Sequence, residues 1–328
     1  MTERKQSVEQ VIEDLAPKLQ GFDIAEHRLS DEISKAMQAV RQDGMALRDI
    51  EVQTPEICMA AVQQNGLALQ YVQDQTPEIC MAAVCQNGFA LKYVKDQTPE
   101  ICVAAVKRCA YALEDVRQQT PEICLIAVQR NGTALQHVEN QTSEICIAAI
   151  RQNSRALQYV QHQTTEICME AVLRDYWALE YVRDQTPDIC MAAVQKNGLA
   201  LQYVKAQTPE ICMAAVCENG LTLKYVQNQT IEICIAAVRE FPAALEYARF
   251  QTPEMCLEAV RRYGLILQKV KEQTPEICMA AAMENSAAIE MIRDSSLRET
   301  IAKALEERAD DIEMEFDAPE TQDDEMSL

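Results

Sequence analysis

The sequence of 328 residues contains only three histidines and eight glycines. Two histidines spaced as in a zinc-protease HExxH motif are missing, and so is the Gly-rich turn that carries a serine nucleophile. None of the glycines forms a phosphate-binding loop. Because the residues that usually carry catalysis are so few, we expect a protein that is not an enzyme, with no catalytic, cofactor-binding or metal-binding residues.

Long apolar runs and a surplus of positive charge are also missing. No uninterrupted apolar stretch approaches the roughly 18 residues that cross a bilayer, and none follows Met1 to Lys5 as in a signal peptide. The chain has 51 acidic and 30 basic side chains, a formal net charge of −21. Nucleic-acid binding needs a dominant basic surface. We therefore expect a cytoplasmic protein that neither inserts into membranes nor binds nucleic acid.

What the sequence does contain is a 22-residue unit, written eleven times without insertion or deletion from Thr54 to Ser295. Counted from its threonine, the repeat has Thr at position 1, Cys at position 5 and Ala at position 8 in every copy. So strict a period indicates one supersecondary unit per copy. Such a unit buries its apolar face only by stacking on its neighbours.

The recurring Asn-Gly pair, as at Asn65-Gly66, favours a β-hairpin at first sight. The same two positions hold Phe241-Pro242 in another copy, however, and proline fixes φ near about −65°, whereas a type I′ turn needs positive φ at both residues. A Thr-Pro-Glu start favours a helix. We therefore predict an elongated all-α solenoid, with helices at positions 2 to 11 and 14 to 21 of each repeat. The glycine is interpreted as a residue that follows the end of the first helix.

The two ends of the chain depart from the repeat, as caps do. A box of Ser296 and Glu299 favours the start of a last helix, and acidic residues with few apolar neighbours favour disorder after it. The predicted domains are an N-terminal helical cap at 1–31, a degenerate first repeat at 32–53, eleven repeats at 54–295, a C-terminal capping helix at 296–309 and an acidic disordered tail at 310–328.

Eleven of the fourteen cysteines stand at position 5 of the repeat. Neighbouring helices about 8–10 Å apart exceed the roughly 7 Å limit for a disulfide, and a spacing of one cysteine per repeat is unlike a metal site. We expect reduced thiols in the core and a reducing compartment. Cys85, Cys109 and Cys217 lie outside this row, and we expect them to be the more exposed thiols.

Positions 10 to 14 vary most between copies and combine arginine with aromatic residues, which is typical of protein-binding hot spots. The alternative is that each aromatic side chain fills a gap where Asn-Gly is absent. We predict that these positions bind a protein partner, with Tyr176 and Trp177 as central anchors and the arginines selecting acidic partners. The predicted partner-binding residues are Arg108, Tyr111, Arg130, Arg174, Tyr176, Trp177, Phe241 and Tyr263.

Three further rows recur along the repeats. The Gln-Thr pair that joins successive copies is interpreted as a hydrogen-bond ladder at the helix ends. The tyrosines of position 18 are expected to stack between copies. The acids of position 3 and the bases of position 20 are expected to lie beside each other as exposed ion pairs and helix-dipole partners.

The segment E-I-C-M-A-A-V-Q-Q-N-G-L-A-L-Q-Y-V at Glu56 to Val72, with a close variant at Asp188 to Val204, resembles the repeat family catalogued as domain of unknown function 4116. The resemblance implies an origin in intracellular bacteria, protists or giant viruses, and no activity. The chain departs from the motif at Cys109-Ala110, Asp175-Tyr176 and Phe241-Pro242, so one ligand per repeat is not expected.

Two hypotheses for the function follow. The first is a non-catalytic protein–protein interaction scaffold, and the alternative is a self-assembling structural repeat protein. The resemblance also implies a host-associated microbe, and the acidic residues from Glu306 to Leu328 are similar to the glutamate-rich export signals of type IV secretion substrates. The scaffold would then be an effector exported to a host cytosol. A short acidic binding segment and a solubilising tail are the alternatives for this stretch.

Overall fold

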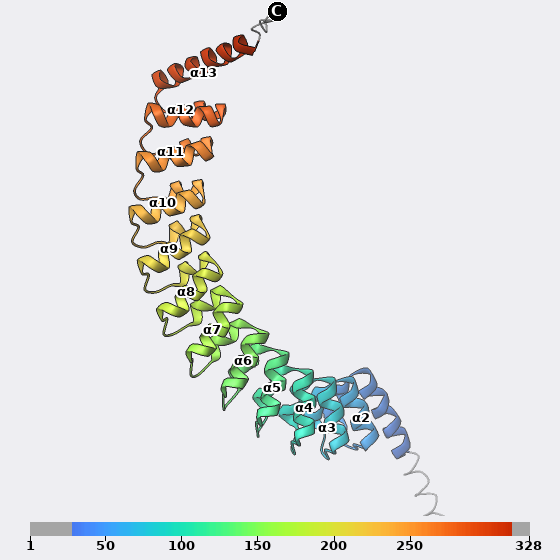
Figure 1. Cartoon of the computed structure of the whole chain (residues 1–328). Coiled ribbons are helices and arrows are strands. Elements are labelled where there is room, and N and C mark those ends of the chain that lie inside the picture. The colour runs from blue at the N-terminus through green and yellow to red at the C-terminus, as the bar shows by residue number, and fades with distance from the viewer. Residues whose placement is uncertain (1–27, 317–328) are drawn as a thin grey trace, which may run out of the picture. The chain divides into compact units, whose positions relative to one another are not determined.

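The computed structural model describes residues 28–316 of the chain (Figure 1). These residues form α-helices and 3-10 helices, and no strand occurs among them. The hairpin alternative is therefore excluded for the described repeats, and the prediction of an all-α solenoid is confirmed. Most of the predicted N-terminal cap, residues 1–27, lies outside the described part, as do residues 317–328 of the predicted tail.

The chain divides into two compact units, which end and begin at His162 and Gln163. In unit 1 a helix over 28–42 precedes the repeats, and in unit 2 the helix α13 follows them. The elements of unit 1 are η1 (Gly44–Asp49), α2 (Pro55–Gln64), η2 (Gly66–Tyr71), α3 (Pro77–Gln86), η3 (Gly88–Tyr93), α4 (Pro99–Arg108), η4 (Ala110–Asp115), α5 (Pro121–Arg130), η5 (Gly132–His137), α6 (Ser143–Gln152) and η6 (Ser154–Tyr159).

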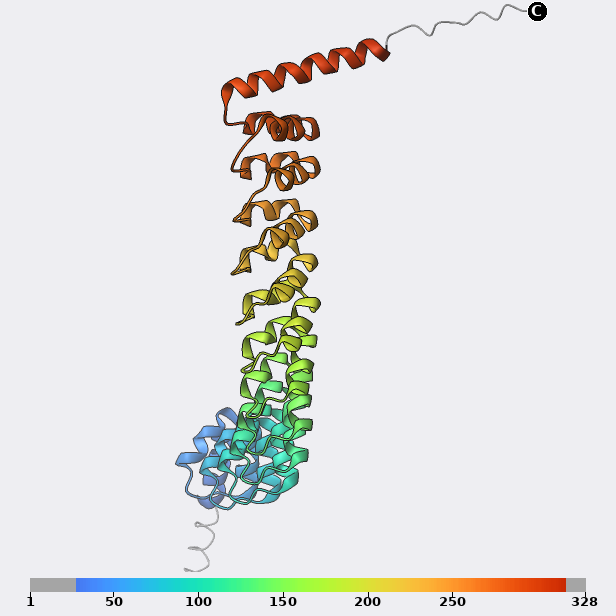
Figure 2. The same cartoon turned by 60° about the vertical axis from the view of Figure 1, so that its left-hand side comes forward.

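Unit 2 continues the same alternation of one α-helix and one 3-10 helix per repeat. Its elements are α7 (Thr165–Arg174), η7 (Tyr176–Tyr181), α8 (Pro187–Lys196), η8 (Gly198–Tyr203), α9 (Pro209–Glu218), η9 (Gly220–Tyr225), α10 (Ile231–Glu240), η10 (Pro242–Tyr247), α11 (Pro253–Arg262), η11 (Gly264–Lys269), α12 (Pro275–Glu284), η12 (Ser286–Met291) and α13 (Ser295–Phe316). Within each unit the α-helices stack side by side in one layer and the 3-10 helices in a second (Figures 1 and 2).

The first helix of each repeat occupies positions 2 to 11, as the sequence predicts. In α2 the hydroxyl of Thr54 accepts the backbone N–H of Ile57 at 3.4 Å, and Pro55 stands at the first helical position. The threonine of every repeat caps its helix in this way. The cap satisfies an N–H group that the helix leaves without a partner.

The second helix differs from the prediction. It is a 3-10 helix over positions 13 to 18, not a helix over 14 to 21. In η2 the N–H of Val72 bonds the carbonyl of Leu69 at 3.1 Å, the i to i+3 pattern of this helix type. The N–H of Gln73 then bonds the side chain of Gln53 from the preceding loop. Because this donor is already occupied, the helix ends before position 20.

The glycine of position 13 follows the end of the α-helix, as expected, but its role is in packing and not in a left-handed helix cap. No glycine among the described residues has a positive φ. A Cβ atom added to Gly132 would lie 2.3 Å from the carbonyl oxygen of Ala149 in the next repeat. Glycine therefore lets the backbone of one repeat approach the position-8 alanine of the following α-helix.

The core runs between the two layers. It contains the side chains of positions 4, 5, 8, 9, 15, 16 and 19, represented in the first repeat by Ile57, Cys58, Ala61, Val62, Ala68, Leu69 and Val72. All fourteen cysteines are free, and the eleven of position 5 are buried. Burial raises the pKa of these thiols, in Cys256 to about 11. Cys85 and Cys217 are exposed and Cys109 is half-buried, as predicted.

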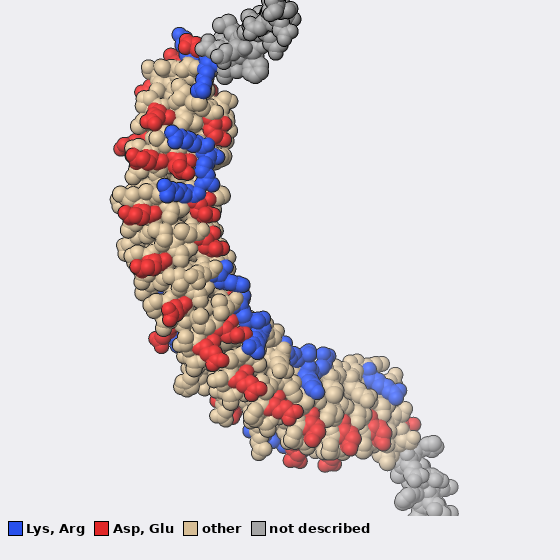
Figure 3. Space-filling view, in the orientation of Figure 1, with Lys and Arg blue, Asp and Glu red and all other residues tan. Residues whose placement is uncertain are grey.

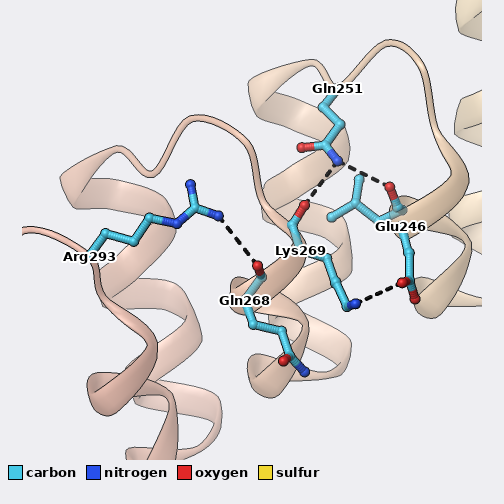
Figure 4. Close-up of polar contacts among 6 residues, drawn as sticks. Glu246, Gln251, Gln268, Lys269 and Arg293 are labelled. Carbon is cyan, nitrogen blue, oxygen red and sulfur yellow. Dashed lines mark hydrogen bonds and ion pairs between the residues drawn. The ribbon is translucent and has the colours of Figure 1, made fainter.

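The predicted Gln-Thr ladder is confirmed. Figure 4 shows one member: the side-chain amide of Gln251 donates to the carbonyl of Leu245 at 3.1 Å and to that of Lys269 at 3.1 Å, so it joins two neighbouring 3-10 helices. Its Oε1 accepts the N–H of Lys271. Each of the eleven glutamines before a repeat threonine donates to the carbonyl of position 18. The ladder supplies hydrogen-bond partners for backbone N–H and carbonyl groups that the short helices leave unpaired.

Bases of position 20 also act on the backbone: Arg117 and Arg293 contact carbonyls at the end of a 3-10 helix, which agrees with the helix-dipole part of the expectation. Arg117 donates to the carbonyls of Lys95 and Val94 in the preceding repeat, at 2.7 and 3.1 Å. Arg293 does the same with Lys271 and Val270, and it reaches the carbonyl of Gln268 in Figure 4. A lysine or arginine that donates to these carbonyls helps to neutralise the negative end of the preceding 3-10 helix.

The last helix, α13, is longer than predicted and begins earlier. Its N-cap is Asp294, whose carboxylate accepts the N–H of Leu297 at 2.9 Å, so the predicted capping residue Ser296 already lies in the first turn. The helix continues to Phe316, and residues 310–316 of the predicted disordered tail are helical. α13 packs on α12 and η12 and buries Ile301 (Figure 2).

Candidate partner-binding edges

Each repeat turns from its α-helix into its 3-10 helix at positions 10 to 14, and successive repeats place these positions along one side of the stack. We call this surface the junction edge. The structure assigns Arg108, Tyr111 and Arg130 to unit 1 and the other five predicted residues to unit 2. The eight residues therefore form two separate candidate sites, one on each unit.

In unit 1 the junction edge is basic. Its five complete repeats carry five bases and no acid at positions 10 to 14, and all five basic side chains are exposed: Lys107, Arg108, Arg130, Arg151 and Arg155. The acids of the same repeats lie elsewhere, as Figure 3 shows in the separation of red and blue side chains on unit 1. A positive strip thus exists on a chain whose net charge is −21.

Two of these arginines also contact the backbone of the repeat before them. Arg108 donates through Nε to the carbonyls of Cys85 and Gln86, at 3.1 and 3.3 Å, and Arg130 donates to the carbonyl of Arg108 at 3.2 Å. In other repeats a glutamine fills position 11, as Gln86 does with the carbonyl of Gln64. The arginines therefore keep a structural hydrogen bond and add an exposed charge.

Tyr111 fits the gap-filling alternative better than a binding role. Its hydroxyl lies 2.6 Å from the hydroxyl of Thr133 in the next repeat, and its ring meets the edge of His137 with centroids 5.8 Å apart. The side chain is half-buried. These contacts join two repeats and leave little of the ring for a partner.

In unit 2 the expected central anchors are partly covered. Tyr176 and Trp177 are half-buried, and the ring of Trp177 meets that of Tyr181 edge-on at 6.3 Å. Arg174, the residue that ends α7, is exposed. Ring contacts of this kind join position 14 to position 18, whereas the expected stacking between two tyrosines of position 18 does not occur among the described residues.

Phe241 and Tyr263 are the predicted aromatic residues that the structure exposes, with 48% and 46% of their surface accessible. Both stand at position 12. In seven repeats this position is an asparagine whose side chain caps the 3-10 helix, as Asn65 accepts the N–H of Leu67 at 3.1 Å. Phe241 and Tyr263 form no such cap. These two repeats have lost a capping hydrogen bond and present an exposed ring.

A groove whose lining includes Arg261, two residues before Tyr263 in the chain, was not expected from the sequence. It lies between α11 and α12, has a volume of about 500 Å³ and is lined by Arg261, Glu276, Met279, Ala280, Met283 and Glu284. Met283 is 52% exposed. Positions 6 and 7 of the repeat are apolar in most copies, with Glu170 and Glu258 as the exceptions at position 7. The apolar side chains at these positions are only half-buried, because they lie on the outer face of the α-helix layer.

The fold and these edges define the chain as an all-α solenoid repeat protein. The model of the family described as "Domain of unknown function (DUF4116)" matches residues 54–98, 120–163 and 164–207. The resemblance found in the sequence is thereby confirmed for these segments, which match the model of that repeat family. No curated protein and no solved structure matches the chain.

Two other features bear on the possible functions. Within residues 28–316, no helix is long and apolar enough to cross a membrane. Among the side chains described, those of residues 28–308, His, Cys, Asp and Glu form no group of three or more that could hold a metal ion.

Proposed function

We propose that this chain is a non-catalytic protein–protein interaction scaffold. The observation that carries the proposal is the replacement of the capping asparagine by Phe241 and Tyr263 in successive repeats of unit 2. A 3-10 helix without its cap is less stable, and a ring that stays about half exposed gains only part of the free energy that full burial would give. Such a local loss is typical of residues kept for binding.

The surroundings of the two rings support this function. Arg261, Met279 and Met283 line the neighbouring groove, and Arg239 lines a second groove between α10 and α11. Aromatic, methionine and arginine side chains are enriched at protein interfaces, and flexible methionines adapt to the shape of a partner. We place the partner-binding site on the junction edge of α10 to α12, with Phe241 and Tyr263 as anchors.

The test replaces Phe241 and Tyr263 by asparagine, the residue most common at position 12 of the repeat. In the double variant Phe241→Asn, Tyr263→Asn, each asparagine restores a cap worth about 1 kcal/mol, which offsets the partial burial lost with the ring. We expect stability to change by no more than about 1 kcal/mol while partner recovery falls at least about tenfold, because anchors of this kind contribute about 2 kcal/mol or more.

Partner recovery is measured by pull-down with quantitative mass spectrometry, against the unchanged chain. The control is Phe89→Ala in unit 1, which removes a ring that is 45% exposed but lies at position 14 of another unit. Undiminished recovery with the double variant would remove this edge from consideration. An equal loss with Phe89→Ala would mean that any exposed ring is enough.

The alternative of end-to-end self-assembly finds less support at the C-terminal end of the repeats. There α13 lies on α12 and η12 and buries Ile301, so the last repeat does not present an open stacking face.

A further inference from the structure

The basic junction edge of unit 1 takes no part in the binding proposed above. Its positive charge favours an acidic partner. Its cations come from three successive repeats: Lys107 and Arg108, then Arg130, then Arg151 and Arg155. The guanidinium of Arg130 reaches the backbone carbonyl of Arg108, so the edges of these two neighbouring repeats lie next to each other. Stacked helices follow each other at about 8–10 Å. The edge is therefore a row of positive charge with a step of that length.

The last part of the base-free acidic stretch 309–328 has a matching step. Residues 317–328 contain five acids and no lysine or arginine, and three of the acids, Asp317, Glu320 and Asp323, are three residues apart. Three residues of an extended or polyproline-II chain span about 9–10 Å. Successive carboxylates of this segment can thus meet successive repeats of the basic edge.

We propose that the basic junction edge of unit 1 binds the acidic segment 317–328 of a second copy of this chain. Asp317, Glu320 and Asp323 lie against the cations of three neighbouring repeats. The contact is electrostatic and exposed, so it is weak and strongly dependent on salt.

A second copy is favoured over the same copy because of reach. The twelve residues of the segment span at most about 43 Å when fully extended. They follow α13, and the six repeats of unit 2 lie between α13 and unit 1 along the chain. At about 8–10 Å per repeat, that stack measures about 50–60 Å from α13 to α7. The segment cannot pass back along its own unit.

The test measures self-association of the full chain by sedimentation equilibrium at about 50 mM and about 500 mM salt. We expect the average mass to rise with concentration at low salt and the association constant to fall at least about tenfold at high salt. A variant with the tail acids replaced by amides (Asp317→Asn, Glu320→Gln, Asp323→Asn, Asp324→Asn, Glu325→Gln) is expected to remain monomeric.

The edge itself is tested with Arg108→Gln, Arg130→Gln. Glutamine occupies position 11 in other repeats and keeps the bond to the preceding carbonyl, so the fold is preserved while two charges are removed. We expect association to weaken by about threefold to tenfold. The matched control, Lys95→Gln, Arg117→Gln, removes two charges from position 20, where Gln73 stands in another repeat, and is expected to associate as the unchanged chain does.

Each result decides the proposal. It is overturned if the unchanged chain is monomeric at low salt, if the tail-neutralised variant still associates, or if the Arg108→Gln, Arg130→Gln variant associates as strongly as the unchanged chain. If, at a concentration where the unchanged chain is monomeric, a labelled peptide of residues 317–328 binds the tail-neutralised chain but not the unchanged one, each copy occupies its own edge, which also overturns the proposal. The Phe241→Asn, Tyr263→Asn variant should associate normally, so this inference and the proposed function fail independently.

Discussion

The repeat at 120–141 and the repeat at 230–251 begin alike and end differently. Both α-helices start with a capping threonine, Thr120 or Thr230. In the first repeat Asn131 then caps η5, and Gly132 packs tightly against the backbone of Ala149. In the second repeat Phe241-Pro242 stands at the same two positions, and the side chain of Phe241 does not cap η10. The difference teaches that the start of each repeat is fixed by folding, while its junction tolerates a loss of stability where a surface is built.

The largest expected effect comes from placing a side chain at the tight junction. In Gly132→Val the new Cβ would collide with the Ala149 carbonyl, 2.3 Å away, and backbone cannot give way as a side chain does. We expect a loss of about 3 kcal/mol, since overpacking costs 1–3 kcal/mol and sometimes more. Urea unfolding and hydrogen exchange of α5 and α6 measure it.

Pro242→Val is the matched control for this substitution. The repeat at 230–251 already holds a ring at that position, so its neighbour leaves room, and we expect a change of less than about 1 kcal/mol. Equal costs at the two sites would contradict the distinction between tight and relaxed junctions.

The next effect concerns the cap. Asn131→Ala removes the acceptor of the Thr133 N–H, a bond of 3.1 Å, and is expected to cost about 1 kcal/mol. Phe241→Ala, which removes no cap, should cost only the partial burial of the ring. If hydrogen exchange in η5 is no faster after Asn131→Ala, the asparagine does not act as a cap, and the argument for Phe241 and Tyr263 weakens with it.

How far the sequence predicts the molecule can be seen within one repeat. The bounds of the α-helix follow from local chemistry, Thr54 and Pro55 at its start and a fixed apolar pattern up to Gln64. The bounds of the 3-10 helix could not be predicted from local sequence, because its end depends on Gln53. This residue belongs to the preceding loop, and its side chain accepts the N–H of Gln73. Contacts between repeats are invisible to a reading of local propensity.

The same reason limits what the sequence predicts of the site. The Asn-Gly pair common at positions 12 and 13 indicates a turn, and turns lie at the surface. The exposure of Phe241 and Tyr263, which replace the asparagine, was therefore predictable from the sequence. The covering of Tyr111 by Thr133 and His137 was not, because it needs the neighbouring repeat in place. The outer face with Met279 was missed because apolar residues at helical spacing usually indicate core.

A smaller effect is expected from Thr222, which stands at position 15 where the two compared repeats carry Ala134 and Ala244. Its side chain is fully buried, and its hydroxyl has no hydrogen-bond partner. A buried hydroxyl without a partner is destabilising. Thr222→Val keeps the shape and removes the hydroxyl, so we expect a gain of about 1 kcal/mol in urea unfolding. A loss of stability would show that the hydroxyl is satisfied in solution.

The smallest effect concerns the common start of the repeats and depends on pH. The backbone N–H of Glu232 and the hydroxyl of Thr230 stabilise the carboxylate of Glu232 and lower its pKa below the ordinary value. Since the folded-state pKa is the lower one, the carboxylate contributes stability above the unfolded-state pKa of about 4.3. This contribution is lost as the pH falls through the folded-state value. We expect Glu232→Gln to be slightly less stable than the unchanged chain at neutral pH and equally stable well below pH 4. Parallel urea titrations at both pH values measure this difference. A deficit of the same size at both would assign the effect of Glu232 to packing rather than to its charge.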